Sequence, residues 1–301
     1  MDRLEAMSLL IAAVEAGSFS AASRKLGVPL PTISRKVAEL EGHLGTRILL
    51  RSTRKLTLTD AGMNYLAACK RILEQVSEAE TEAAGEYSAP KGELVITAPI
   101  VFGRLHVVPL VNDFLISFPE INVRMMLADR SVNLLDDHID MAVRIGALAD
   151  SSMVATRVGS VRRIVCGSPG YFASHGTPRT PDNLAQLTCV TFSGLPAGAS
   201  WAFKAGRGLV QAAPPRCRLN VNTAEAAIDS ALAGVGITHV LSYQVAQAVS
   251  DGRLVPVLTE FEADPIPVHL VHAGQGLLPL KMRRFLDFAV PRLRRVLGNL
   301  K

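Results

Sequence analysis

Short hydroxyl side chains and two cations gather in one stretch of the chain, a combination that suits the reading of DNA. The stretch begins at Pro31, and its polar members are Thr32, Ser34, Arg35 and Lys36. Short hydroxyl groups can approach base edges and phosphates closely, and one arginine can donate two hydrogen bonds to a guanine. If a helix presents these residues, they are suited to contact double-stranded DNA in the major groove.

The residues around this stretch predict that it opens the third of three short helices. Apolar residues recur at helical spacing from Leu4 to Val14, and Ser18 can cap a second helix that Gly27 closes. Pro31 suits the first turn of a third helix, where its missing N–H group costs little. The expected buried stripes are Leu4, Met7, Ile11 and Val14 in the first helix and Ile33, Val37, Leu40 and Leu44 in the third. Two short helices joined by a turn are typical of a helix-turn-helix.

A basic turn between two apolar runs predicts a small β-hairpin, or wing. Residues 48–50 and 56–58 are the expected strands on either side of the turn. Cations at such a tip suit phosphate contacts or insertion into the minor groove. The residues expected to contact the DNA backbone or the minor groove are Ser20, Arg51, Thr53, Arg54 and Lys55. The alternative is a basic turn that is simply solvated.

A long helix is expected over residues 60–88, with Thr59 as its cap and Asp60 at its positively polarised start. Its apolar stripe is Tyr65, Cys69, Ile72, Val76, Ala79 and Ala83. A helix of this length spans roughly 40 Å, which is more than one small domain can cover. We therefore expect the stripe to pair with that of a second copy in a dimer. The alternative is that the helix packs against its own chain.

The first 62 residues closely resemble the LysR-type transcriptional regulators. The resemblance is carried by residues 17–22 (GSFSAA), 34–41 (SRKVAELE), 44–45 (LG), 51–54 (RSTR) and 58–62 (LTDAG). Many members place a glutamine just before the recognition helix, where this chain has Leu30. No base preference is therefore carried over from relatives.

Composition indicates a globular chain in a reducing compartment. Hydrophobic residues make up 49% and charged residues 20%, and the net charge is +5. Lys and Arg are denser at the N-terminal end, with nine against six Asp and Glu in residues 1–60. Acidic residues interrupt the start, so no signal peptide is expected, and no apolar run reaches the ~18 residues of a membrane span. The four cysteines lack CxxC spacing, so no zinc ribbon is expected. Together these features predict a cytoplasmic protein with no metal, no cofactor and no membrane partner.

Residues 91–301 predict an α/β domain of two lobes. In the first part, strands are expected at 94–96, 121–127 and 141–145, and they alternate with helices over 103–118 and about 132–137. Further strands are expected at 164–167, 189–192, 216–221, 237–240 and 266–271. Such β-α-β alternation implies a mainly parallel sheet with helices on its faces. A helix capped by Asn222 should end at Gly234, and a closing helix should end the chain. We expect lobe I to comprise 91–160 and 266–301, and lobe II to comprise 161–265.

The resemblance implies a periplasmic-binding-protein-like (type 2) effector domain, with its inducer in a cleft between the lobes. Ligands of open α/β sheets lie beyond the carboxyl ends of strands and against helix N-termini. The residues that this reasoning places there are Pro99, Ile100, Val101, Phe102, Phe192, Asn222 and Thr223. Many relatives have Ser or Thr where this chain has Ala98 and Pro99, which favours an apolar ligand head or contact through backbone N–H groups. Asn222 has a second interpretation, as a purely structural helix cap.

Three other functions are alternatives to a regulator that responds to a small molecule. An enzyme is disfavoured because GxGxxG, GxxxxGK[ST], GxSxG and HExxH are all missing from the sequence. A redox sensor could use Cys189 and Cys217, but their apolar, strand-like surroundings favour a core role. A DNA-binding protein without an effector is the third alternative, and the two predicted lobes speak against it.

These expectations combine into one organisation. An all-α winged helix-turn-helix (1–59) would bind promoter DNA, a long linker helix (60–88) would form a homodimer, and an effector-binding domain (91–301) would bind a small molecule. Two recognition helices related by a two-fold axis require a partly palindromic site. The resemblance further implies a homotetramer, and RNA polymerase as a partner if the regulator is an activator.

Overall fold

The protein is described from a computed structural model, which divides into two compact units, Met1–Ala89 and Pro90–Lys301. Each unit is described by itself. The residues described are 2–51, 56–83, 89–129, 133–134, 137–148, 153–192, 201–206, 208–212, 216–274 and 278–299.

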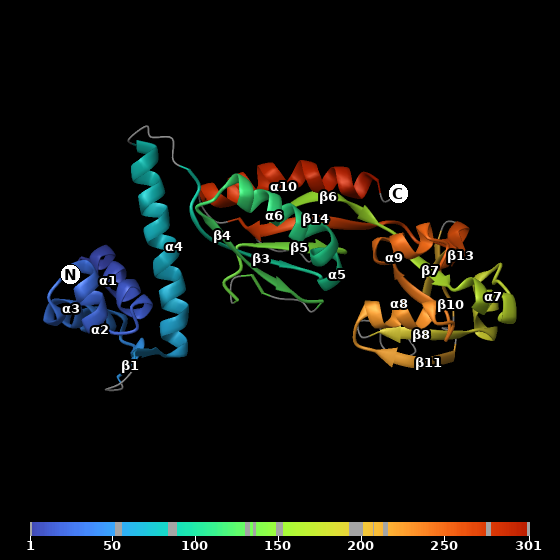
Figure 1. Cartoon of the computed structure of the whole chain (residues 1–301), viewed down its shortest axis with the longest axis horizontal. Helices are drawn as coiled ribbons and strands as arrows, with labels where there is room; N and C mark the ends of the chain where they lie inside the picture. Colours follow the sequence, from blue (N-terminus) through green and yellow to red (C-terminus); the bar gives the residue numbers. More distant parts are fainter. Residues whose placement is uncertain are drawn as a thin grey trace. The chain divides into compact units, whose positions relative to one another are not determined.

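The N-terminal unit begins with the three predicted helices, α1 (Arg3–Glu15), α2 (Phe19–Leu26) and α3 (Leu30–Leu44) (Figure 1). The Ser18 hydroxyl accepts a hydrogen bond from the Ala21 N–H group at 3.1 Å, so Ser18 caps α2 as expected. Gly27 ends α2 with a φ of 69°, in the left-handed region that a glycine adopts at little cost. These local signals fix the turn between α2 and α3.

Helix α1 is buried on more sides than the sequence stripe predicts. Leu10 and Ala13 are completely buried, whereas Leu4, a member of the expected stripe, is 40% exposed. The reason is that α1 packs against α2, α3 and α4 together and so buries several faces. In α3 the prediction holds better, since Ile33, Val37 and Leu40 are buried while Leu44 is half-buried.

A small hairpin and a long helix complete this unit. Strands β1 (Leu49–Arg51) and β2 (Leu56–Leu58) pair antiparallel, and α4 covers Asp60–Ala83. The Thr59 hydroxyl accepts from the Gly62 N–H group at 2.9 Å and donates to the Arg47 carbonyl oxygen at 2.9 Å. The predicted cap is therefore confirmed, and it also ties the hairpin to the helix.

The predicted stripe of α4 is divided between two environments. Cys69 is fully buried, and Tyr65, Leu66 and Leu73 pack on the core of the N-terminal unit. Ile72 is 38% exposed, and the stripe continues from it along the helix through Val76 and Ala79. The first half of α4 thus packs against its own chain, while the second half retains an apolar stripe that this unit does not cover.

In the C-terminal unit, lobe I is built on one mixed sheet with the strand order β4-β3-β5-β14-β6. The strands are β3 (Gly92–Ala98), β4 (Ile121–Leu127), β5 (Met141–Ile145), β6 (Met153–Val161) and β14 (Ile266–Ala273). Only β4, β3 and β5 run parallel, because β14 pairs antiparallel with both β5 and β6. The expectation of a mainly parallel sheet missed β6 and this antiparallel half.

Helices cover the sheet of lobe I. Residues 100–117 form α5 (Ile100–Phe102), a π-helical turn over Gly103–Val107 and α6 (Val108–Ser117), and α10 covers Leu280–Gly298. Helices α6 and α10 lie along one face of the sheet (Figure 1), where Phe114 meets the Phe285 ring at 5.1 Å. The helix expected over 132–137 is not found in the described residues of that stretch, which form turns at Leu134, Asp137 and His138.

The segment Ile100–Ser117 is long and apolar enough to cross a membrane by length and composition alone, and a sharply bent pair, α1 with α2, passes the same test. In the structure, Phe102, Val107, Leu110 and Phe114 of this segment are buried in the lobe I core. Their burial accounts for the apolar composition, as expected of a core helix in a globular domain.

Lobe II contains three small sheets. One has the order β12-β7-β13, a parallel pair joins β8 and β11, and a hairpin joins β9 and β10. Its strands are β7 (Arg163–Gly167), β8 (Thr188–Phe192), β9 (Trp201–Ala205), β10 (Gly208–Ala212), β11 (Arg216–Val221), β12 (Thr238–Leu241) and β13 (Val255–Val257). Its α-helices are α7 (Pro169–His175), α8 (Ala224–Leu232) and α9 (Ser242–Ser250), with 3-10 turns at Pro181–Gln186 and Thr259–Phe261. The sequence reasoning missed β9, β10, β13 and α7.

Candidate DNA-binding and effector-binding sites

The start of α3 carries the residues expected to read DNA. Pro31 is exposed in the first turn, and Thr32 and Ser34 are half-buried. The Arg35 side chain is 64% exposed, and its Nη1 lies 2.7 Å from the Glu39 Oε1 one turn along the helix. Such an exposed i,i+4 pair contributes only a few tenths of a kcal/mol, about 0.3–0.5. Arg35 can therefore leave Glu39 for a base or a phosphate at little cost.

Lys36 stands in a different environment from Arg35. Its side chain is only 17% exposed, and its ammonium group pairs with the Glu5 carboxylate of α1. This pair links α3 to α1. Of the two predicted cations, Arg35 is thus the more accessible.

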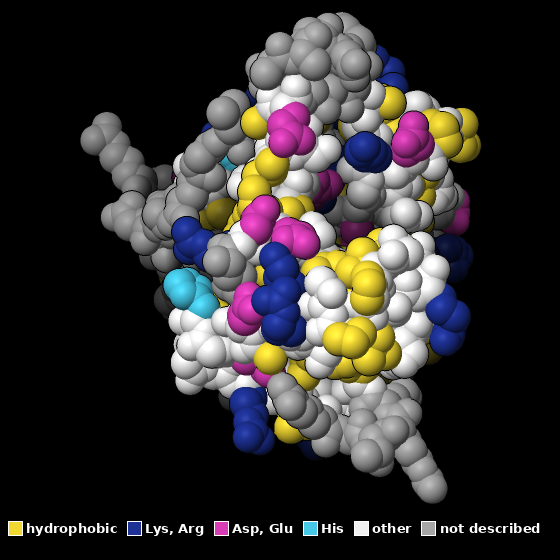
Figure 2. Space-filling model, turned by 90° about the vertical axis from the view of Figure 1, so that its left-hand side faces the viewer, with side chains coloured by type: hydrophobic (Ala, Val, Ile, Leu, Met, Phe, Trp, Pro, Cys, Tyr) yellow, Lys and Arg dark blue, Asp and Glu magenta, His cyan; other side chains and the backbone are white. Residues whose placement is uncertain are grey.

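Ser20 is exposed in the first turn of α2, beside the capping Ser18. Arg51 ends β1, and only its backbone belongs to the described part of the chain. The predicted wing tip, with Thr53, Arg54 and Lys55, lies outside the described residues. On the face shown in Figure 2, Lys and Arg side chains are interspersed with Asp and Glu, as the pairs of Arg35, Lys36 and Lys70 also indicate.

The hairpin is held in place by part-buried hydrogen bonds. The Glu41 carboxylate of α3 accepts from the Ile48 N–H group at 3.0 Å and from the Leu49 N–H group at 3.1 Å. The Thr59 N–H group donates to the Ile48 carbonyl oxygen at 3.1 Å. The first strand of the hairpin is thereby anchored to the helix that carries Arg35, and the Thr59 bond closes the two strands at their base.

The four predicted effector residues of lobe I lie at the end of β3. Pro99 precedes α5, and the Ile100 N–H group donates to the Asp129 carboxylate at 3.0 Å. Val101 and Phe102 are almost completely buried, at 2% and 0% exposure. Phe102 packs edge-on against the Tyr243 ring of α9 at 5.2 Å, which is a contact between the lobes. Phe102 therefore contributes to packing rather than offering an open ligand surface.

In lobe II, the start of α8 differs from the prediction in one respect. The helix cap is Thr223, whose hydroxyl accepts from the Ala226 N–H group at 3.3 Å, and not Asn222. Thr223 has the extended backbone of a cap residue, and the helix begins at Ala224. Asn222 is exposed, and Phe192 is half-buried at the end of β8. The capping role expected of Asn222 thus belongs to its neighbour, and among the described residues the Asn222 amide has no hydrogen-bond partner.

Two acidic residues, Asp129 and Glu225, act on a tyrosine near these residues. Burial above all, and then the negative charge of Asp129, raises the pKa of Tyr243. Glu225 contributes in the same direction, and its Oε2 atom is buried without a hydrogen-bond partner in the described part of the chain. Tyr243 thus lies in a polar region, where the carboxylates of Asp129 in lobe I and Glu225 in lobe II both raise the pKa of its hydroxyl group.

The two cysteines weighed as a redox pair are neighbours across β8 and β11. Cys189 is fully buried, whereas Cys217 is exposed, so the expected apolar surroundings hold only for Cys189. Burial is the main cause that raises the pKa of the Cys189 thiol to about 12. The described residues include no group of three or more His, Cys, Asp or Glu side chains that could hold a metal ion.

A buried histidine gives the C-terminal unit a predicted acid sensitivity. The pKa of His239 is lowered from an ordinary value of 6.5 to about 3, mainly by burial and to a smaller extent by the positive charge of Arg163. Between these two values the unfolded chain binds a proton that the folded chain does not. We therefore expect the contribution of His239 to stability to be constant above pH 6.5 and to fall toward pH 3, by at most about 1.4 kcal/mol per pH unit.

His239→Phe should remove this contribution and flatten the pH dependence of unfolding, followed by the fluorescence of Trp201. His175→Phe, which changes an exposed histidine of the same lobe, is the matched control and should leave the slope as it is. An unchanged slope in the His239 variant would mean that His239 takes up its proton in the folded protein as well.

The two units together define a class of protein, a DNA-binding transcriptional regulator with a separate α/β domain for a small molecule. A sequence profile described as "Bacterial regulatory helix-turn-helix protein, lysR family" matches residues 4–63, and one described as "LysR substrate binding domain" matches residues 88–294. The chain belongs to the LysR-type transcriptional regulators. It is therefore a regulator rather than an enzyme, with DNA and a small-molecule effector as its partners.

Individual relatives agree with this membership. The chain is 35% identical to an HTH-type transcriptional repressor of Pseudomonas aeruginosa strain UCBPP-PA14, over 96% of this chain and 92% of that one. It is similar to the solved structure of CrgA, a LysR-type transcriptional regulator from Neisseria meningitidis, with 31% identity, a TM-score of 0.62 and coverage of 96% of this chain and 98% of that one. Full-length LysG from Corynebacterium glutamicum with bound effector Arg has a TM-score of 0.60 at 18% identity, over 97% of this chain and 98% of that one, and shows the fold alone.

Proposed function

We propose that this regulator binds a partly palindromic promoter site as a homodimer in the cytoplasm. Arg35, Thr32 and Ser34 would read bases in the major groove, and Ser20 and the wing would contact the backbone. The observation that carries the proposal is the exposed guanidinium of Arg35 at the start of α3, which pairs with Glu39 of the same helix. Leu30, the first residue of α3, is 41% exposed and suits an apolar contact with a thymine methyl group.

The apolar stripe on the second half of α4 supports dimerisation through that helix. Ile72 is 38% exposed and is followed at helical spacing by Val76 and Ala79. Burial of such a stripe against a second copy would remove apolar surface from water. Association of the effector domains into a tetramer, and contact with RNA polymerase if the regulator is an activator, extend this proposal.

We place the effector between the lobes, near the end of β3 and the start of α8. The backbone N–H groups of Val101 and Phe102, the half-buried Phe192 and the exposed side chain of Asn222 would contact it, with Pro99, Ile100 and the capping Thr223 alongside. The unpartnered Glu225 carboxylate oxygen and the Asp129 carboxylate favour an effector that donates hydrogen bonds or carries positive charge. A bound ligand would shift the population between two arrangements of the lobes.

Asn222→Ala tests this placement. A library of small metabolites would be screened for compounds that raise the melting temperature of the full chain, and the affinity of each active compound would then be measured for the variant. We expect a loss of about tenfold or more, as for one hydrogen bond to a charged or polar ligand group. Asn122→Ala, an exposed asparagine on β4, is the control and should bind as the wild type does. Equal affinity in the wild type and the Asn222 variant would remove Asn222 from the effector site.

A further inference from the structure

Lobe II contains a pocket of about 200 Å³ that none of the proposed effector residues lines. Its floor follows from the register of three strands. On β7, Arg163 and Val165 are two residues apart and so point to the same face of the sheet. His239 of β12 and Val257 of β13 lie directly opposite Val165 in the flanking strands, and therefore share that face.

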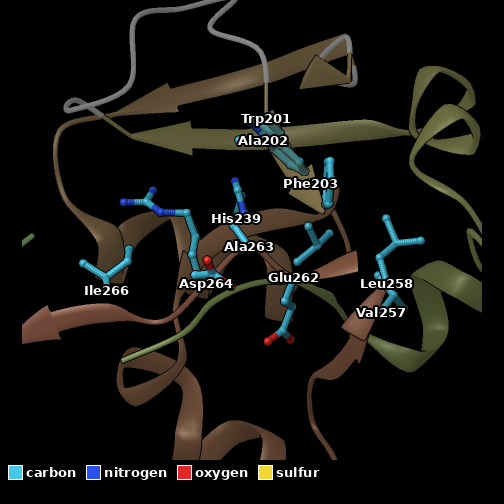
Figure 3. Close-up of a pocket in the computed structure, with 12 residues that line it drawn as sticks. Trp201, Ala202, Phe203, His239, Val257, Leu258, Glu262, Ala263, Asp264 and Ile266 are labelled. Carbon is cyan, nitrogen blue, oxygen red and sulfur yellow. The ribbon is translucent and has the colours of Figure 1, made fainter. Parts of the chain in front are cut away.

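Two aromatic residues of the β9 strand cover this floor. Trp201 and Phe203 are each 2% exposed, and they too are two residues apart on one strand. The Trp201 ring lies 4.7 Å from the His239 ring, and the Phe203 ring lies 6.0 Å from it. Figure 3 shows Trp201, Phe203 and His239 together on one side of the pocket, with Val257 and Leu258 on another. The walls are thus largely apolar and aromatic.

Arg163 brings a positive charge into this apolar pocket. Its guanidinium is half-buried, and it forms no ion pair with a carboxylate among the described residues. The acidic residues that line the pocket already have partners. Glu262 pairs with Arg162 at 2.8 Å, and its carboxylate points away from Trp201 and Phe203 in Figure 3, while Asp264 contacts Lys204 at 3.5 Å. A desolvated cation of this kind favours an anionic partner.

His239 supplies a second polar atom. Its Nδ1 is buried and has no hydrogen-bond partner in the described part of the chain. Because burial keeps this imidazole neutral at physiological pH, Nδ1 can carry a hydrogen and donate it, or accept one, according to the tautomer. A buried polar atom without a partner is costly unless a ligand or a water molecule satisfies it.

We propose that this pocket is a second small-molecule site, for an aromatic monocarboxylate whose carboxylate binds Arg163 and His239 and whose ring lies against Trp201 and Phe203. The size agrees, since an apolar cavity of about 150 Å³ can hold a benzene molecule and the volume here is about 200 Å³. One ring and one carboxylate therefore fit, and a second ring does not. None of the residues proposed to contact the effector lines this pocket, although Arg163 also acts electrostatically on Tyr243.

The sequence provides a direct readout, because Trp201 is its only tryptophan. The full-length protein would be titrated with benzoate, phenylacetate and cyclohexanecarboxylate, and with benzamide as an uncharged analogue of benzoate. We expect saturable changes in Trp201 emission with benzoate, and an affinity for benzamide at least tenfold weaker. No saturable change with any of the three carboxylates, or equal binding of benzamide, would overturn the proposal.

Variants then locate the binding. Arg163→Met should weaken benzoate binding at least tenfold, and Arg163→Lys, which keeps the charge without the planar fork, should weaken it by a smaller factor. Arg253→Met removes a cation that pairs with Asp251 elsewhere in lobe II and should bind as the wild type does. If Arg163→Met fails to fold, Arg163→Lys and the benzamide comparison still decide the question. The opposite pattern would be benzoate binding that survives in the folded Arg163→Met variant but is lost in Asn222→Ala. That result would place benzoate in the inter-lobe site, and it would overturn the second-site proposal without affecting the proposed effector site.

Discussion

Gly62→Ala is expected to unfold the N-terminal unit and abolish DNA binding. A Cβ atom at Gly62 would lie 2.0 Å from the Ile48 carbonyl oxygen, a backbone atom that cannot rotate away. That same oxygen accepts the hydrogen bond of the Thr59 N–H group, so moving it would also disrupt the anchor of the hairpin. We expect a loss of at least about 3 kcal/mol, at the upper end of overpacking effects.

The measurement is denaturant unfolding followed by circular dichroism, together with DNA affinity. Trp201 reports only on lobe II, so its emission should stay native while the helical signal of the N-terminal unit is lost. Gly42→Ala is the matched control, because nothing lies within 4 Å of a Cβ atom there. An alanine inside α3 should stabilise the unit by about 0.5–1 kcal/mol. A Gly62 variant that melts like the wild type would contradict the packing described for α4 on the hairpin.

Arg35→Ala should weaken specific DNA binding by about 10- to 100-fold, the value of one arginine that donates two hydrogen bonds to a base. Non-specific affinity should fall by a much smaller factor, because one phosphate contact is worth little by comparison. The variant should remain folded, since the Arg35 side chain is 64% exposed and its partner among the described residues is Glu39, one turn along the same helix.

Competition binding against random DNA over a series of salt concentrations measures both affinities. Glu39→Gln releases Arg35 from its ion pair and should keep specific binding. Arg71→Ala, which removes an exposed cation of α4, should change neither affinity by more than about threefold. Equal losses on specific and random DNA in the Arg35 variant would mean that Arg35 contacts phosphates rather than bases.

Much of the fold could be predicted because its signals are local. Helix ends could be predicted at Ser18, Gly27 and Thr59, because capping hydrogen bonds and a left-handed glycine involve only a few neighbouring residues. The structure confirms all three. The antiparallel half of the lobe I sheet could not be predicted in this way. Strand β6 pairs with β14, more than a hundred residues further along the chain, and no local pattern specifies that partner.

The candidate sites were predictable to a lesser degree. The resemblance pointed to the start of α3, but it could not show that Arg35 is accessible while Lys36 is engaged with Glu5. In the same way, capping propensity does not distinguish Asn222 from Thr223, because both residue types cap helices and the backbone decides between them. The pocket around Arg163 gave no sequence signal, since its residues come from four separate segments. The closest sequence pattern is the two-residue spacing that puts Arg163 and Val165 on one face of β7, and Trp201 and Phe203 on one face of β9.

The most direct test of the account is a footprint of the purified protein on DNA from the region upstream of its own gene, with random DNA as competitor. We predict preferential protection of two half-sites on one face of the duplex, separated by about one helical turn or a multiple of it. Binding no tighter than to random DNA, with and without the compounds found in the effector screen, would contradict a sequence-specific regulator.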